Sequence, residues 1–135
     1  MRYITGVHAL NLPCSLLTSG DWHQSGIKWD KIRYNDSENS FFGDYGIEPC
    51  ETVPENDGLY YIANTIRALL DLLEQSNFAV AQGMKEDFIC NDNYTKEVFK
   101  RVSMMKNLDN WNEIDRFMGK EYLCEWLNYK ERTEI

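Results

Sequence analysis

The sequence has little of what usually marks a metal centre or an active site. It contains only two histidines, His8 and His23, among its 135 residues. Its four cysteines are widely scattered, and no two of them stand at the C-x-x-C spacing of structural zinc sites. We therefore expect neither a metal nor a cofactor, and we expect reduced cysteines that act mostly as small apolar side chains.

Long apolar runs and positive charge are also lacking. No run approaches the roughly 18 apolar residues that span a bilayer, and residues 1–6 lack the apolar core of a signal peptide. The 14 basic residues face 22 acidic ones, which gives a formal net charge of −8. This balance disfavours direct binding of nucleic acid or anionic lipid, although mimicry of DNA by carboxylates stays open. We expect a cytoplasmic protein whose acidic surface attracts a basic protein partner.

Proline is confined to the first part of the chain. All three prolines fall in residues 1–57, whereas residues 58–132 contain none and show the apolar spacing of helices. Aromatic residues make up 13% of the chain, which indicates a folded core. No linker or repeat separates the two parts. We predict a single α+β domain over residues 1–135, with a β-rich part at 1–57 and a helical part at 58–132.

Three segments of the β-rich part are candidates for strands of a small antiparallel sheet. They contain β-branched and aromatic residues and are bounded by turn-forming residues, which is typical of strands. The candidate strands cover residues 3–10, 27–34 and 41–47.

The first helix of the helical part has the strongest pattern in the sequence. Asn56 or Asp57 can cap it near Gly58. Apolar residues then recur at three- and four-residue steps and predict the central element of the core, with Arg67 and Asp71 on the opposite face. The residues of this stripe are Leu59, Ile62, Ile66, Leu69, Leu70 and Leu73.

Shorter helical patterns follow, so that the sheet is expected to pack on a body of about four helices. Asp92 or Asn93 can cap one helix, and Asp109 can start another. Gly119 is expected to break that helix, and a last helix carries Trp126 toward the core.

Residues with acid–base or nucleophilic chemistry concentrate near the N-terminus. His8, Asp21 and His23 would converge if the first strand and the following loop folded back on each other, and could then share proton-transfer work. No H-E-x-x-H pattern supports a metal site there. Cys14 beside a histidine would supply a thiol nucleophile and its base. The alternative is that the histidines are hydrogen-bonded structural residues and that Cys14 belongs to the core.

Four further residues are candidates for a binding surface. Trp22 lies in the Gly-Asp-Trp-His segment, where the alternative is that it anchors a loop to the core. Asp44 and Tyr45 lie between two glycines amid aromatic residues and could line a ligand groove. Trp111 could belong to an interaction surface, because aromatic residues are enriched at interface centres, or to the core.

Three stretches resemble small uncharacterised bacterial proteins encoded in accessory or mobile regions. They are HALNLPC at residues 8–14, GDWH at 20–23 and IRALLDLL at 66–73. Proteins of this kind are sometimes found in toxin–antitoxin or phage-defence settings. The resemblance covers most of the chain, but it implies no reaction and no catalytic residues.

Two functions follow from these observations. The first is a soluble interaction module that neutralises or regulates a partner protein, like an antitoxin or a defence-system inhibitor, by occluding a basic surface. The alternative is a small hydrolase or transferase that acts on a nucleotide or nucleic acid through His8, Asp21 and His23. The sequence leaves the oligomeric state open.

Overall fold

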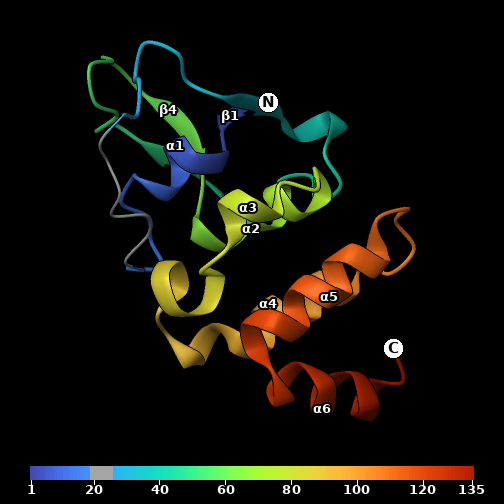
Figure 1. Cartoon of the computed structure of the whole chain (residues 1–135). Coiled ribbons are helices and arrows are strands. Elements are labelled where there is room, and N and C mark those ends of the chain that lie inside the picture. The colour runs from blue at the N-terminus through green and yellow to red at the C-terminus, as the bar shows by residue number, and fades with distance from the viewer. Residues whose placement is uncertain (19–25) are drawn as a thin grey trace.

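The computed structural model describes residues 1–18 and 26–135 and confirms the α+β class (Figure 1). Four short strands form one sheet in the order β2-β1-β4-β3. The strands are β1 (Arg2–Ile4), β2 (Tyr34–Asp36), β3 (Ile47–Cys50) and β4 (Tyr60–Ala63). β1 pairs with β2 and β3 with β4 in antiparallel fashion, whereas the central pair β1–β4 is parallel. The sheet is therefore mixed, where an antiparallel sheet was predicted.

The predicted strands were too long and partly misplaced. Only residues 3 and 4 of the first segment belong to a strand, because Gly6 adopts a positive φ of 64° and the chain turns into the helix α1 (Gly6–Leu10). Residues 27–33 form turns and bends, and pairing begins only at Tyr34. Residues 41–46 are a turn, after which β3 starts at Ile47. β-Branched and aromatic residues favour strands only where a neighbouring strand is available to pair with them.

The first helix of the helical part is α2 (Thr65–Glu74), and it begins later than predicted. Residues 60–63 are strand β4, because they pair with β3 on one side and β1 on the other. The N-cap is Asn64, whose side chain accepts a hydrogen bond from the backbone N–H of Arg67 at 2.8 Å. All residues from Thr65 to Leu73 are buried, so that α2 is the central element of the core, as predicted.

The later helices are α3 (Phe78–Ala81), the π-helical turn η2 (Met84–Ile89), α4 (Thr95–Ser103), α5 (Trp111–Tyr122) and α6 (Cys124–Thr133) (Figure 1). Of these, α3, η2 and α4 contact α2, whereas α5 contacts η2 and α6 packs on α5. Gly119 does not interrupt α5, which continues to Tyr122. The break falls at Leu123, whose φ of 54° separates α5 from α6. Short 3₁₀ turns lie at η1 (Ser37–Asn39) and η3 (Asp92–Tyr94).

Aromatic side chains join α4, α5 and α6. The ring of Phe99 on α4 lies 4.9 Å from that of Tyr122, 5.1 Å from that of Trp126 and 5.2 Å from that of Tyr129, measured between centroids. Trp126 is the only buried residue of α6. Burial of this one indole and its neighbours therefore holds α6 on the rest of the molecule.

Candidate functional site

A buried ion pair lies at the centre of the fold. Arg67 and Asp71 stand one turn apart on α2, and the Nε of Arg67 donates to Oδ1 of Asp71 at 2.9 Å. Their side chains are 0% and 1% exposed. Taking two charges out of water is costly unless each is paired and fully hydrogen-bonded. The surroundings of this pair therefore decide whether it can be stable.

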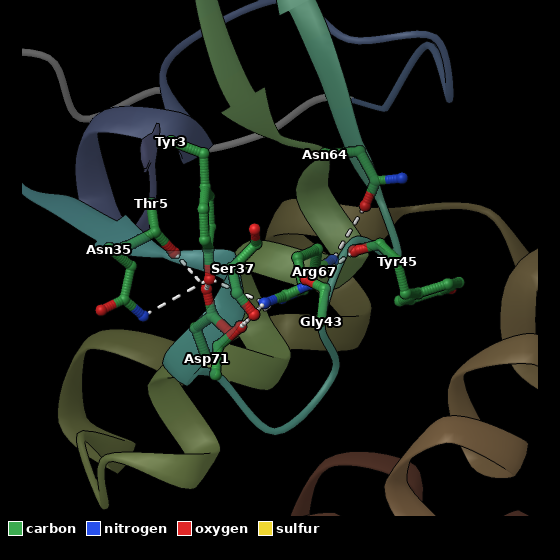
Figure 2. A network of polar contacts seen from close by, with 10 residues as sticks. Tyr3, Thr5, Asn35, Ser37, Gly43, Tyr45, Asn64, Arg67 and Asp71 are labelled. Carbon is green, nitrogen blue, oxygen red and sulfur yellow. Dashed lines mark hydrogen bonds and ion pairs between the residues drawn. The ribbon is translucent and has the colours of Figure 1, made fainter. Parts of the chain in front are cut away.

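The guanidinium of Arg67 uses all five of its N–H donors inside the protein (Figure 2). One of them goes to Asp71, and the rest go to groups on other parts of the chain. The remaining four reach the carbonyl oxygens of Gly43 and Tyr45 at 2.7 and 2.6 Å, the hydroxyl of Tyr3 at 2.8 Å and Oγ of Ser40 at 2.6 Å.

The carboxylate of Asp71 is satisfied by the first strand as well as by Arg67. Its Oδ2 accepts hydrogen bonds from the hydroxyls of Tyr3 and Thr5, both at 2.6 Å. Thus α2, β1 and the segment around residues 40–45 meet at one pair of opposite charges (Figure 2). Because every donor of the guanidinium is occupied, this network organises the fold and offers no donor to an incoming ligand.

The hydroxyls of two tyrosines near this network favour their protonated form. Burial, followed by the hydrogen bond to Asp71, raises the pKa of Tyr3 to about 12. Burial and the hydrogen bond to Glu97 likewise raise the pKa of Tyr45 to about 12. A raised folded-state pKa contributes stability below the ordinary value of 10.0, and this stability is lost as the pH rises from there toward about 12.

The protein is therefore expected to unfold more readily as the pH rises through this alkaline window. Denaturant unfolding across the window measures the slope of stability against pH. The variant Tyr3→Phe is expected to be less stable at neutral pH but to show a shallower slope, because its ring has no proton to lose. Tyr61→Phe, which alters an exposed side chain on β4, is the control and should keep the parent slope. Equal slopes for the parent and Tyr3→Phe would contradict the prediction.

Asp44 and Tyr45 are the two residues that the sequence predicted to line a ligand groove. The backbone of this segment wraps around Arg67, and the side chain of Asp44 is exposed. The Tyr45 hydroxyl donates to Glu97 on α4 at 3.0 Å, and the Arg101 guanidinium lies 3.8 Å from the centre of its ring. Tyr45 therefore joins the sheet part of the molecule to α4.

His8 is buried, and both of its ring nitrogens are engaged by backbone groups. Nδ1 accepts from the N–H of Arg33 at 3.3 Å, so that Nε2 carries the proton and donates to the carbonyl of Lys28 at 3.0 Å. The ring also packs edge-on against Trp29, 5.2 Å away. This arrangement favours the structural role that the sequence left as the alternative to catalysis.

Cys14 does not pair with His8. Its Sγ lies 3.6 Å from the Thr65 hydroxyl and 3.7 Å from the Thr18 hydroxyl, so that it contacts the start of α2. A thiol–imidazole pair between Cys14 and His8 is therefore not formed. The other predicted residues of this region, Asp21, Trp22 and His23, lie outside the described residues, so the convergence of Asp21 and His23 with His8 and the binding role of Trp22 stay predictions.

Trp111 is half-buried and belongs to the aromatic cluster of the helical part. Its ring lies 6.3 Å from that of Trp126, with the planes inclined at 61°. The indole N–H of Trp126 donates to Asp115 at 2.8 Å, and Asp115 is also paired with Lys130. Trp111 thus supports the position of α6 from the side of α5.

The Arg67–Asp71 network is the feature that sequence reasoning missed. The helical pattern placed both residues on the face opposite the apolar stripe, which is ordinarily the solvent-facing side of a helix, and the structure shows that both residues are buried nonetheless. A signal was present, since IRALLDLL holds one basic and one acidic residue at i,i+4 spacing within an otherwise apolar run. Such a run leaves α2 no polar face, so the two charges have to be paired with each other inside the core.

The outer face of α6 is the most exposed apolar feature of the helical part. Leu123, at the junction with α5, is 65% exposed and Leu127 is 55% exposed, and the two stand one helical turn apart. Glu131 continues the same line by another turn and is exposed. We call these three residues the α6 face.

A group of carboxylates borders the start of α6. Lys85 of η2 is bonded to Glu125 at 3.0 Å and lies 3.7 Å from Glu86. Hydrogen bonding to Glu125, reinforced by Glu86 and Asp92, raises the pKa of the lysine, so it stays charged. One cation is thus shared among three carboxylates, which leaves this edge of the molecule negative.

Two further structural findings concern metal ions and membranes. Among residues 1–18 and 26–135, no three side chains of His, Cys, Asp or Glu are grouped so that they could hold a metal ion. Within the same ranges, no helix combines the length and the apolarity that crossing a bilayer requires.

Comparison with known proteins adds no relative to these observations. No family model, no curated protein and no solved structure matches the chain.

Proposed function

We propose that this protein is an interaction module that binds a partner protein and neutralises or regulates it, in the manner of an antitoxin or a defence-system inhibitor. It acts by covering a basic surface of the partner. The observation that carries this proposal is the α6 face, where Leu123 and Leu127 are exposed side by side next to a carboxylate-rich edge.

Apolar and acidic groups play different roles in such an interface. Two leucines that leave water contribute affinity, because burial of an aliphatic side chain is worth roughly 1.5–3 kcal/mol. The surrounding carboxylates, with the net charge of −8, favour approach to a basic surface and speed association. A partner held by both would be bound more tightly at low ionic strength than at high ionic strength, because salt screens the charge attraction.

The test is a capture experiment from a lysate of the natural host. Immobilised protein is expected to retain a basic protein at about 0.1 M salt and to lose most of it near 1 M, where the screening length falls from about 10 Å to about 3 Å. The captured protein is then purified, and its own activity is expected to fall when the module is added.

Variants locate the interaction on the molecule. Leu123→Ser combined with Leu127→Ser removes the apolar part of the α6 face and is expected to abolish capture. Leu59→Ser is the matched control, since Leu59 is 56% exposed but lies before β4 in the sheet part. If both variants capture the partner equally well, or if the partner's activity is unaffected, the proposed function is wrong.

A further inference from the structure

A groove of about 690 Å³ runs between α4 and α6, and Glu131 of the α6 face is among its lining residues. The aromatic rings of Phe99 and Tyr129 form its floor. Thr95 lies on the α4 side and Asn128 on the α6 side. The two helices lie side by side along it, since Phe99 contacts Tyr129 and the Ser103 hydroxyl lies 3.5 Å from that of Tyr129.

Carboxylates outnumber cations along the lining of the groove. Asp92, Glu125 and Glu131 face the two basic residues Lys96 and Arg132. Asp92 also lines a neighbouring depression that contains Lys85, Glu86 and Cys90, and Lys85 is already bonded to Glu125. The surplus negative charge is therefore concentrated where η2, η3 and the start of α6 meet.

The ring of Tyr122 contacts that of Phe99 at this end of the groove. The same negative charge acts on the phenol group of Tyr122. Burial raises the pKa of its phenol, and nearby carboxylates raise it further. Negative potential at this point disfavours a phenolate and favours a cation. The contributing carboxylates are those of Glu121, Glu125, Asp92 and Glu86.

We propose that the α4–α6 groove receives a basic helical segment of the partner and holds an arginine or lysine side chain between Asp92 and Glu125. This inference rests on the proposed function, because it assigns the partner's chemistry to a groove that Glu131 of the α6 face also lines. A cation fits because it meets carboxylates at the rim and an aromatic floor, and both attract guanidinium and ammonium groups. A helix fits because the space between two adjacent helices accepts the ridge of side chains of a third.

The groove also requires an occupant that is amphipathic. Its apolar residues would contact the rings of Phe99 and Tyr129 in the groove. Its basic residues would point toward Asp92 and Glu125 at the start of α6. A helix with apolar residues on one face and basic residues on the adjacent face makes both kinds of contact.

The experiment uses a synthetic amphipathic helix with leucine on one face and arginine on the other. A peptide of 10 residues has the length of α6, since each residue of a helix adds about 1.5 Å. Binding to the full chain is measured by calorimetry, with a peptide in which glutamate replaces arginine as the negative control. The arginine peptide is expected to bind, and the glutamate peptide is expected not to bind.

Two double variants with the same net charge test the position of the site. Asp92→Asn combined with Glu125→Gln is expected to weaken peptide binding by about tenfold or more. Glu51→Gln combined with Glu55→Gln removes two exposed carboxylates in the loop between β3 and β4 and is expected to leave binding unchanged. Asn128→Trp fills the groove without changing the charge and is expected to abolish binding. Thermal melts establish that each variant is folded.

The outcomes separate this inference from the proposed function. If the natural partner is captured equally by the parent and by Asp92→Asn/Glu125→Gln, the groove assignment is wrong and the interaction module stands. If the peptide binds with the expected dependence on the variants but no partner is captured and inhibited, the groove is a binding site and the proposed function is wrong. If both double variants weaken peptide binding equally, the attraction is a non-specific effect of charge, and the assignment of the groove as the binding site is wrong.

Discussion

Replacing Arg67 with methionine is expected to lower the free energy of unfolding by about 3–5 kcal/mol. The substitution fills much of the same volume, but it leaves the carboxylate of Asp71 buried without its counter-ion. It also removes the donors to the carbonyl oxygens of Gly43 and Tyr45. Denaturant unfolding at neutral pH, followed by circular dichroism, measures the loss.

The surface of α4 offers a matched control. Arg101 and Glu97 form the same i,i+4 pair, with the Nε of Arg101 2.8 Å from Oε1 of Glu97, but both side chains are partly exposed. Arg101→Met is expected to cost only about 0–1 kcal/mol, because water screens the pair. A double variant Arg67→Met/Asp71→Leu should recover part of the loss, since it removes the unpaired charge. Equal losses for Arg67→Met and Arg101→Met would mean that the buried network does not stabilise the fold as described.

Gly46→Ala is expected to be the second most damaging single change. Gly46 has a φ of 73°, and a Cβ at this position would lie 2.7 Å from Cβ of Arg67 and 3.1 Å from Oδ1 of Asn64. The backbone conformation costs a residue with a side chain about 1–2 kcal/mol. Displacement of the packed neighbours adds about 1–3 kcal/mol. Thermal and denaturant unfolding measure the sum of the two costs.

Gly43→Ala separates these two costs. Gly43 also has a positive φ, of 56°, but a Cβ there meets no atom within 4 Å. Its substitution is therefore expected to show only the backbone cost. If Gly43→Ala destabilises the protein as much as Gly46→Ala does, the close approach of Gly46 to α2 contributes nothing, and the account of this turn is wrong.

The helical part could be predicted from sequence because its pattern is local. Apolar residues at three- and four-residue steps identified α2 as the central helix, and the structure confirms this. Its start was misplaced because Asn56 and Asn64 are equally good caps in isolation. Pairing of residues 60–63 with β1 and β3 decides between them, and a local pattern carries no trace of such pairing.

The sheet could be predicted only in outline for the same reason. Its central contact joins Ile4 to Ile62 in parallel, so the two strands are connected through most of the β-rich part. Strand direction depends on how that long connection runs, and composition does not encode it. The ion pair of α2 was missed because a helical pattern distinguishes apolar from polar faces, whereas Arg67 is polar and fully buried.

The candidate site residues can be compared with the structure only within the part of the chain that it describes. The sequence identified His8 as a residue with potential chemistry, but not that backbone groups of Lys28 and Arg33 would engage both ring nitrogens. Those partners lie 20 and 25 residues away, in a segment that was predicted to be a strand. Long-range hydrogen bonds of this kind depend on the tertiary fold, which the composition of residues 6–23 does not determine.

The two outermost strands make the sheet a poor template for aggregation. β2 has only three residues, and β3 carries Pro49, which has no N–H to donate to a further strand. An extended segment from another copy would find few consecutive backbone groups to pair with on either border. The protein can therefore display exposed leucines at its helical end without offering a backbone edge along which copies would polymerise.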